Sequence, residues 1–127
     1  MSVERLRAGD WDTLVIGSEV PVLVEFVTRT CPVCATMEPA VEKLAGKMGD
    51  QARFFEVNVE RERSLAMRYG VQGVPTFMVF CKGNLVSSQV GEVYPKVLER
   101  MVTEAGEFGG MCASKATKVI YEMTGYG

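Results

Sequence analysis

The sequence predicts an α/β domain in which a mixed central β-sheet is flanked by helices on both faces. Apolar segments with the two-residue period of strands alternate with segments of helical period along most of the chain. The last two strand segments are joined by a short glycine-containing connection, which indicates an antiparallel hairpin beside otherwise interleaved strands. At 127 residues, the chain has the usual length of one domain.

Eight elements are expected, in the order helix, strand, helix, strand, helix, strand, strand, helix. Their ranges are 6–16, 21–27, 35–48, 54–59, 61–69, 76–81, 85–90 and 98–105. The spacing between them is short throughout, and we find no repeat or linker before about residue 103.

Apolar periodicity and helix-ending residues define the first four elements. The first helix carries Trp11, and the run Pro21–Val27 is predicted to be a buried strand because Glu25 is its only charge. In the next helix, apolar residues recur on one face, Pro39 is expected to kink the axis, and Gly49-Asp50 ends the helix. The fourth element alternates apolar and polar residues, which is typical of a strand with one buried face.

The last four elements begin with a charged helix in which Leu65 and Tyr69 share one face. Two strands follow, separated by Lys82-Gly83-Asn84, a three-residue connection typical of a hairpin. In the final helix, Leu98 and Val102 recur on one face, which predicts that this face packs against the sheet.

Composition narrows the possible functions. The chain has 14 basic and 16 acidic residues, a formal charge of −2 and no basic block, so neither nucleic acid nor a membrane surface is expected as a partner. It contains no histidine, which excludes histidine nucleophiles, general bases and metal ligands. The first residues lack the apolar stretch of a secretory signal, and a cytoplasmic location is therefore expected.

Two cysteines with the spacing of a redox pair stand between a predicted strand and the helix that follows it. In Cys31-Pro32-Val33-Cys34, the unpaired N–H groups and the dipole at the helix start should stabilise a thiolate at Cys31. Cys34 lies about one helical turn further on, so it can resolve a mixed disulfide. Pro32 fits the first helical turn and stiffens the loop. The pair predicts thiol–disulfide exchange that needs no bound cofactor.

The alternative role for this pair is zinc binding. Structural zinc sites generally need a second close cysteine pair or histidines, and the other two cysteines, Cys81 and Cys112, are isolated in the sequence. Redox chemistry is therefore favoured, and no metal site is predicted. Cys81 ends a predicted strand and is expected to be an inert, packed thiol.

Several motifs in order resemble the thioredoxin family from about residue 11 to residue 102. Val-Leu-Val-Glu-Phe leads into the Cys-x-x-Cys pair, Pro39 lies in the following helix, and Val74-Pro75-Thr76 follows a Tyr-Gly-Val-x-Gly segment. Gly91 falls where the family has a late glycine. The resemblance implies the thioredoxin fold, and Trp11 falls where that family has a buried aromatic side chain.

The resemblance also implies a surface that binds extended substrate segments. It places the Val74–Pro75 bond in the cis form, facing the cysteine pair, where the backbone of Val74 can pair with a substrate. Without the resemblance, the trans form would be expected, because cis bonds are a small minority of X–Pro bonds. The residues assigned to substrate binding are Val74, Pro75, Thr76, Pro32, Val33 and Gly91.

Glu25 occupies the strand position at which the thioredoxin family usually has a buried aspartate. Burial would raise its pKa, and the carboxylate would accept a proton, through water, when Cys34 is deprotonated for attack. The alternative is a solvent-facing charge, which fits poorly in such an apolar run. The family's frequent lysine near this acid is replaced by Glu56, which would raise the pKa of Glu25 further if the two are close.

Other positions depart from the family pattern and leave the direction of electron flow open. Thr30 replaces the usual tryptophan, and Pro32-Val33 replaces the usual Gly-Pro. A proline after the first cysteine also occurs in glutaredoxins and in strongly oxidising disulfide oxidases. Arg29 either adds positive potential near Cys31 or is an exposed arginine with no such role.

The function predicted from the resemblance is that of a protein-disulfide reductase. Cys31 attacks a protein disulfide, and Cys34 resolves the mixed disulfide with help from Glu25. An external reductase, either a flavoprotein or ferredoxin-linked, would then restore the dithiol. Two alternatives stay open: a glutaredoxin-like oxidoreductase that uses glutathione, and a redox-silent thioredoxin-like binding module.

Residues 1–105 are expected to form the domain, and residues 106–127 an extension of it. A connection rich in glycine is followed by a pattern of helical period, so a short helix is predicted. Its apolar face comprises Cys112, Ala116, Val119, Ile120 and Met123. This helix is expected to pack on its own domain, which leaves the protein a monomer. The alternatives are that Cys112 forms a disulfide or that the helix mediates dimerisation.

Overall fold

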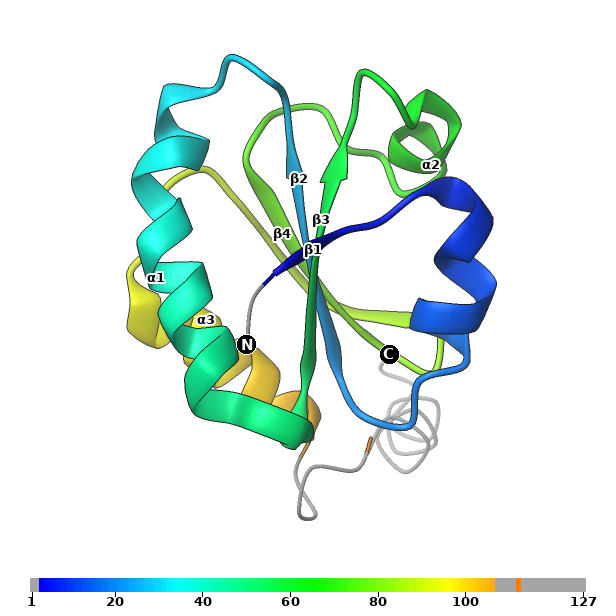
Figure 1. Ribbon diagram of the computed structural model, residues 1–127, viewed down its shortest axis with the longest axis vertical. Helices are drawn as coiled ribbons and strands as arrows, with labels where there is room; N and C mark the ends of the chain where they lie inside the picture. The colour runs from blue at the N-terminus through cyan, green and yellow to red at the C-terminus, as the bar shows by residue number, and fades with distance from the viewer. Residues whose placement is uncertain (1–2, 107–111, 113–127) are drawn as a thin grey trace, which may run out of the picture.

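A mixed five-stranded sheet forms the centre of the protein (Figure 1). The computed structural model describes residues 3–106 and residue 112. The strands lie in the order β1-β3-β2-β4-β5. β1 and β2 run parallel to β3, whereas β4 is antiparallel to both β2 and β5. The strand bounds are β1 Glu4–Arg5, β2 Val22–Val27, β3 Arg53–Asn58, β4 Thr76–Cys81 and β5 Asn84–Val90.

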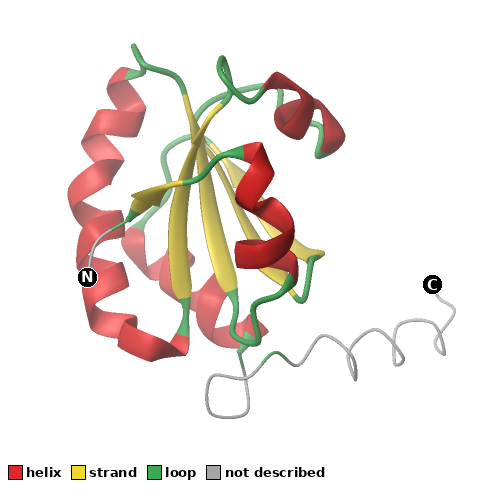
Figure 2. Cartoon of the chain, turned by 45° about the vertical axis from the view of Figure 1, so that its right-hand side comes forward, coloured by secondary structure: helices red, strands yellow, loops and turns green. Residues whose placement is uncertain are grey.

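Helices cover both faces of this sheet, as Figures 1 and 2 show. On one face lie α1 and α3, and on the other lie α2 and two short irregular helices, η1 and η2. The short helix η3 continues from the end of α1. The helix bounds are α1 Pro32–Met48, α2 Arg63–Arg68, α3 Pro95–Ala105, η1 Ala8–Asp10, η2 Asp12–Ile16 and η3 Gly49–Gln51.

Each face of the sheet buries its own apolar core. Leu23 and Phe77 of the sheet pack with Leu98 and other residues of α1 and α3. On the opposite face, Trp11 is only 1% exposed, as expected for a core anchor. Its indole N–H donates a hydrogen bond to the Tyr69 hydroxyl at 3.2 Å. Trp11 therefore satisfies its one polar group while it remains buried.

The central elements of the sequence prediction are confirmed, and the first predicted helix is wrong. Residues 6 and 7 belong to no helix or strand, and a 3-10 turn at Ala8–Asp10 and a π-helical turn at Asp12–Ile16 follow. In the π-helical turn the Gly17 N–H donates to the carbonyl of Asp12, five residues earlier. The hairpin turn is shorter than predicted, because Lys82 and Gly83 both adopt positive φ and Asn84 already belongs to β5.

The helix after the cysteine pair runs without interruption from Pro32 to Met48 and includes Pro39. Most of the predicted C-terminal helix lies outside the described residues, which include only Gly106 and Cys112 of the extension. None of the helices in the described part of the chain is long and apolar enough to cross a membrane.

Candidate functional site

A disulfide joins Cys31 and Cys34 at the start of α1, and their Cα atoms are 5.2 Å apart. Cys31 is the N-cap residue, and its Sγ accepts a hydrogen bond from the backbone N–H of Cys34 at 3.1 Å. Pro32 opens the helix at a position where no backbone N–H is needed. The sulfur of Cys31 thus lies against a helix N-terminus, where backbone dipoles stabilise negative charge.

The two sulfurs differ in their access to solvent. Cys34, in the first turn of α1, is only 8% exposed, whereas Cys31, the N-cap residue, is partly exposed. Thr30 and Arg29 precede the pair and are exposed. A substrate can therefore reach Cys31 from outside, while Cys34 can react only with a sulfur already bound to Cys31.

Glu25 lies near the end of β2, which leads directly into the cysteine pair. The residue is 3% exposed, and its Oε2 atom has no hydrogen-bond partner among the described residues. Glu25 pairs in register with Phe77 of β4 on one side and with Glu56 of β3 on the other. A carboxyl group held in this way is both desolvated and free to exchange a proton.

The surroundings of Glu25 strongly favour its protonated form. Burial is the main cause, and the charges of Glu56 and of Glu38 on α1 add to it, so that the pKa of Glu25 rises from 4.5 to about 8. Glu56 itself pairs with Arg5 of β1 at 3.2 Å. The carboxyl group of Glu25 therefore keeps its proton to a higher pH than an ordinary glutamate does.

A loop at the same end of the sheet contains the predicted substrate-binding residues. The Val74–Pro75 peptide bond is cis, as the family resemblance implies. Thr76 begins β4, pairs with Phe26 of β2 and donates a hydrogen bond to the Gly73 carbonyl at 2.6 Å. Because Phe26 lies next to the end of β2, this loop and the chain segment that holds the cysteine pair lie at one end of the sheet.

Gly91 fixes this loop from the other side. Its N–H donates to the Pro75 carbonyl at 2.7 Å, and its φ of +89° is one that residues with a Cβ atom rarely adopt. Val74 is partly exposed and makes no backbone hydrogen bond to another described residue. The other two residues assigned to substrate binding, Pro32 and Val33, are exposed and partly exposed in the first turn of α1.

A second disulfide joins Cys81 to Cys112, which corrects the prediction that Cys81 is an inert free thiol. The sequence analysis did consider a disulfide at Cys112, but it did not identify the partner. The two cysteines are 31 positions apart, and only the packing of α3 against β4 brings them together. Among the described residues, no group of three or more histidine, cysteine or acidic side chains is arranged to hold a metal ion.

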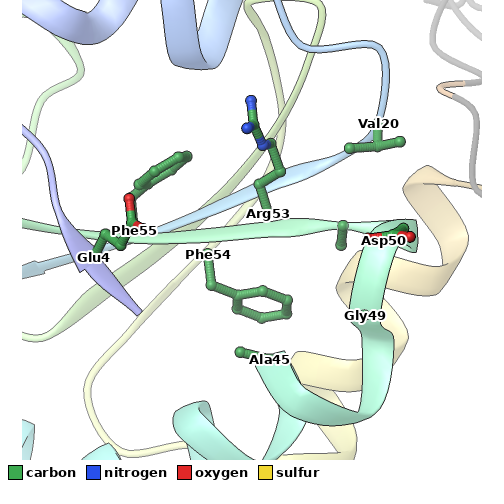
Figure 3. A pocket seen from close by; sticks show the side chains of 9 residues that line it. Glu4, Val20, Ala45, Gly49, Asp50, Arg53, Phe54 and Phe55 are labelled. Atoms are coloured by element: carbon green, nitrogen blue, oxygen red, sulfur yellow. The ribbon is translucent and has the colours of Figure 1, made fainter. Parts of the chain in front are cut away.

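A hollow of about 250 Å³ lies away from the cysteine pair, beside the beginning of β3 (Figure 3). Phe54 points from the strand toward Ala45 of α1, whereas Arg53 and Phe55 point to the opposite side. Glu4 and Asp50 also line the hollow. It contains none of the predicted catalytic or substrate-binding residues, and the Cys31–Cys34 pair lies at the other end of the sheet.

Solved structures with the same arrangement are thioredoxins. A mutant thioredoxin from Halobacterium salinarum NRC-1 superimposes with a TM-score of 0.72 at 29% sequence identity, covering 81% of this chain and 88% of that one. The thioredoxin of Malassezia sympodialis gives a TM-score of 0.73 at 27% identity, covering 81% and 90%. The fold is therefore the thioredoxin fold.

Sequence comparison gives the same result. A chloroplastic thioredoxin of Arabidopsis thaliana is 34% identical over 102 residues, which are 80% of this chain and 53% of that protein. Thioredoxin 1 of Synechococcus elongatus is 37% identical over 79 residues, 62% of this chain and 74% of the relative. The chain spans only a little over half the length of three chloroplastic thioredoxins to which it is similar. Because the thioredoxin family model matches residues 2–104, the chain belongs to the thioredoxin family.

Proposed function

We propose that the protein is a dithiol–disulfide oxidoreductase that reduces disulfide bonds in other proteins. The observation that carries this proposal is the Cys31–Cys34 pair itself: a disulfide at a helix N-terminus in which one sulfur is accessible and the other is buried. A thiolate is stabilised at such a position, and the difference in burial assigns the order in which the two sulfurs react.

The reaction starts from the reduced pair. The Cys31 thiolate attacks one sulfur of the substrate disulfide, forms a mixed disulfide and releases the other substrate sulfur as a thiolate, which takes up a proton. The thiol of Cys34 then loses its proton and attacks Cys31 Sγ. This step releases the second substrate thiol and leaves the Cys31–Cys34 disulfide, so two electrons have passed to the substrate.

Glu25 is the residue that we assign to accept the Cys34 proton. Its buried position, its unpartnered Oε2 and its pKa of about 8 support this assignment. A carboxyl group with such a pKa is partly ionised at neutral pH, so it can take up a proton and return it without a large energetic cost. We expect the transfer to run through water between the Glu25 carboxyl group on β2 and Cys34 in the first turn of α1.

The substrate surface comprises the loop before β4 and the first turn of α1. The free backbone groups of Val74 can pair with an extended substrate segment, and Gly91 and Thr76 hold the loop that presents them. Pro32 and Val33 offer a small apolar surface beside the reactive sulfur. Recognition through the backbone is consistent with a range of protein substrates that differ in sequence.

The dithiol is regenerated by an external reductase that supplies two electrons. We expect this reductase to be a flavoprotein or a ferredoxin-linked enzyme. This direction of electron flow needs a reducing compartment, and we expect the cytoplasm. The relatives include chloroplastic thioredoxins and a thioredoxin from Haemophilus influenzae that is 24% identical over 102 residues.

Turnover of a protein disulfide tests the proposal. Insulin reduction is followed by turbidity with dithiothreitol as the electron donor, for the wild type and for Cys31→Ser. We expect the wild type to accelerate reduction well above the dithiothreitol background and the variant to give background alone. No acceleration by the wild type, together with turnover of a glutathione mixed disulfide, would instead indicate a glutaredoxin-like activity.

A further inference from the structure

The second disulfide lies at the end of the sheet opposite to the first. β4 begins at Thr76, beside the Cys31–Cys34 end, and finishes at Cys81. Five residue steps along a strand correspond to roughly 17 Å. The two cysteine pairs of one molecule are therefore too far apart to exchange disulfides directly, and Cys81–Cys112 must react with thiols from outside.

The residues Cys81 and Cys112 are buried to different extents. Cys81 is fully buried, and its Sγ lies 3.5 Å from the Ala105 carbonyl at the end of α3. Cys112 is only partly buried and packs against the edge of the core formed with α1 and α3. An incoming thiolate can therefore approach Cys112 Sγ but not Cys81 Sγ. The Ala105 carbonyl gives the Cys81 thiol a hydrogen-bond acceptor once the disulfide is reduced.

Backbone contacts hold Cys112 in place as well. Its N–H donates to the Glu19 carbonyl at 3.3 Å. Glu19 belongs to a tight turn in which the buried hydroxyl of Ser18 donates to the Val20 carbonyl at 2.8 Å. Residue 112 is thus joined to the turn before β2 by a hydrogen bond and to the end of β4 by a covalent bond.

We propose that Cys81–Cys112 is a second thiol–disulfide exchange site, which small dithiols reduce by attack on Cys112 Sγ. When oxidised, this disulfide fastens residue 112 to the end of β4. A thiolate of the dithiol attacks Cys112 Sγ, and the Cys81 sulfur leaves and takes up a proton. The second thiol of the reductant then attacks its own bound sulfur, closes a cyclic disulfide and releases Cys112 as a thiol. Two electrons pass from the dithiol to the protein.

The site should react more slowly than the Cys31–Cys34 pair. Cys81 must leave into an apolar environment, which disfavours a thiolate. In the first pair the incoming thiolate attacks Cys31, and Cys34 leaves within the first turn of α1, where backbone N–H groups and the helix dipole stabilise negative charge. Reduction should therefore occur in two kinetic steps, of which the second loosens the attachment of residue 112 without affecting the first pair.

The test uses the full chain and dithiothreitol as the probe. Oxidised protein is exposed to dithiothreitol, quenched with iodoacetamide at intervals and digested with trypsin. The Cys81–Cys112 bond then links the peptide 69–82 to the peptide 101–115, whereas Cys31 and Cys34 lie together in the peptide 30–43. Before reduction we expect the two peptides joined by the Cys81–Cys112 bond to be detected together. During reduction this bond should be lost at least about tenfold more slowly than the Cys31–Cys34 bond.

Two variants keep the proposal falsifiable. In the double variant Cys31→Ser with Cys34→Ser, the slow step should persist at an unchanged rate, and Cys112→Ser should retain wild-type insulin turnover within about twofold. In reduced, folded protein, iodoacetamide should label Cys112 at least about tenfold faster than Cys81. Absence of the linked peptides, a slow step that disappears in the double variant, or equal labelling of Cys81 and Cys112 would overturn the proposal.

Discussion

Glu25 and Glu56 lie in register on the parallel strands β2 and β3, so two carboxyl groups are neighbours on the face of the sheet that α1 covers. Arg5 pairs with Glu56 and leaves Glu25 without a cation. Burial is the main reason that the charged form of Glu25 is disfavoured, and the neighbouring charge of Glu56 adds to the effect. The buried member of the pair therefore keeps its proton to an unusually high pH.

Replacing Glu25 should make the protein more stable at neutral and alkaline pH. Its pKa is about 8 in the folded protein, compared with 4.5 for the ordinary group. Between these values the unfolded chain releases a proton that the folded chain retains, so wild-type stability falls as the pH rises toward 8. The difference in free energy of unfolding between Glu25→Gln and the wild type should therefore shift in favour of the variant by roughly 2–4 kcal/mol from about pH 5 to about pH 8. Urea denaturation at both pH values measures it.

Glu104→Gln is the matched control for this experiment, because Glu104 is exposed on α3. Its stability relative to the wild type should change little over the same pH interval. A Glu25→Gln variant whose stability parallels the wild type at all pH values would show that Glu25 ionises normally in the folded protein.

Removing the charge of Glu56 should lower the pKa of Glu25. In Glu56→Gln the repulsion disappears and Arg5 is left without its carboxylate partner, so both changes favour ionised Glu25. Burial remains, and the pKa should therefore stay above 4.5. Titration of the Glu25 side-chain carboxyl carbon by NMR measures the midpoint directly. Glu99→Gln, which removes an exposed pair with Lys47, is the control and should leave this midpoint unchanged.

The site could largely be predicted from the sequence because its residues are close together along the chain or follow strong local signals. The Cys31–Cys34 spacing, the helix start at Pro32 and the isolated charge of Glu25 are all visible within about fifteen residues. The cis form of the Val74–Pro75 bond is different, because local preference favours trans and only the resemblance to a family implied it.

What could not be predicted depends on contacts between distant segments. The strand β1 has two residues, too few for a period, and it exists only because Glu4 pairs with Phe55. The pairing of Cys81 with Cys112 likewise requires α3 to be packed on the sheet first. The position of Arg5 beside Glu56 follows from the same strand pairing, so the ion pair was also missed.

Cys34→Ser should trap the protein on its substrate. Because Cys34 is buried and forms the disulfide with Cys31, it is the sulfur placed to resolve the mixed disulfide, and serine cannot replace it. A reduced substrate-trapping variant mixed with an oxidised protein substrate should accumulate a one-to-one adduct through Cys31, detected by intact mass and reversed by dithiothreitol. Cys31→Ser should form no comparable adduct. Equal adduct formation by both variants would contradict the assigned order of attack.

Gly91→Ala should impair the action on protein substrates through the loop that presents Val74. A Cβ atom at Gly91 would meet no neighbouring atom, so the cost comes from the φ of +89°, roughly 1–2 kcal/mol of stability. Relief of this strain would displace the N–H that holds the Pro75 carbonyl.

The matched control is Gly46→Ala, in the interior of α1, where a Cβ atom also meets no neighbour and the backbone is helical. This change should stabilise the protein by roughly 0.5–1 kcal/mol and leave insulin turnover unaltered. For Gly91→Ala we expect a raised KM for insulin and little change in the reaction of Cys31 with a small disulfide, since that thiol lies on a different segment. An equal loss with both substrates would show that Gly91 supports the cysteine pair itself instead of the substrate-binding loop.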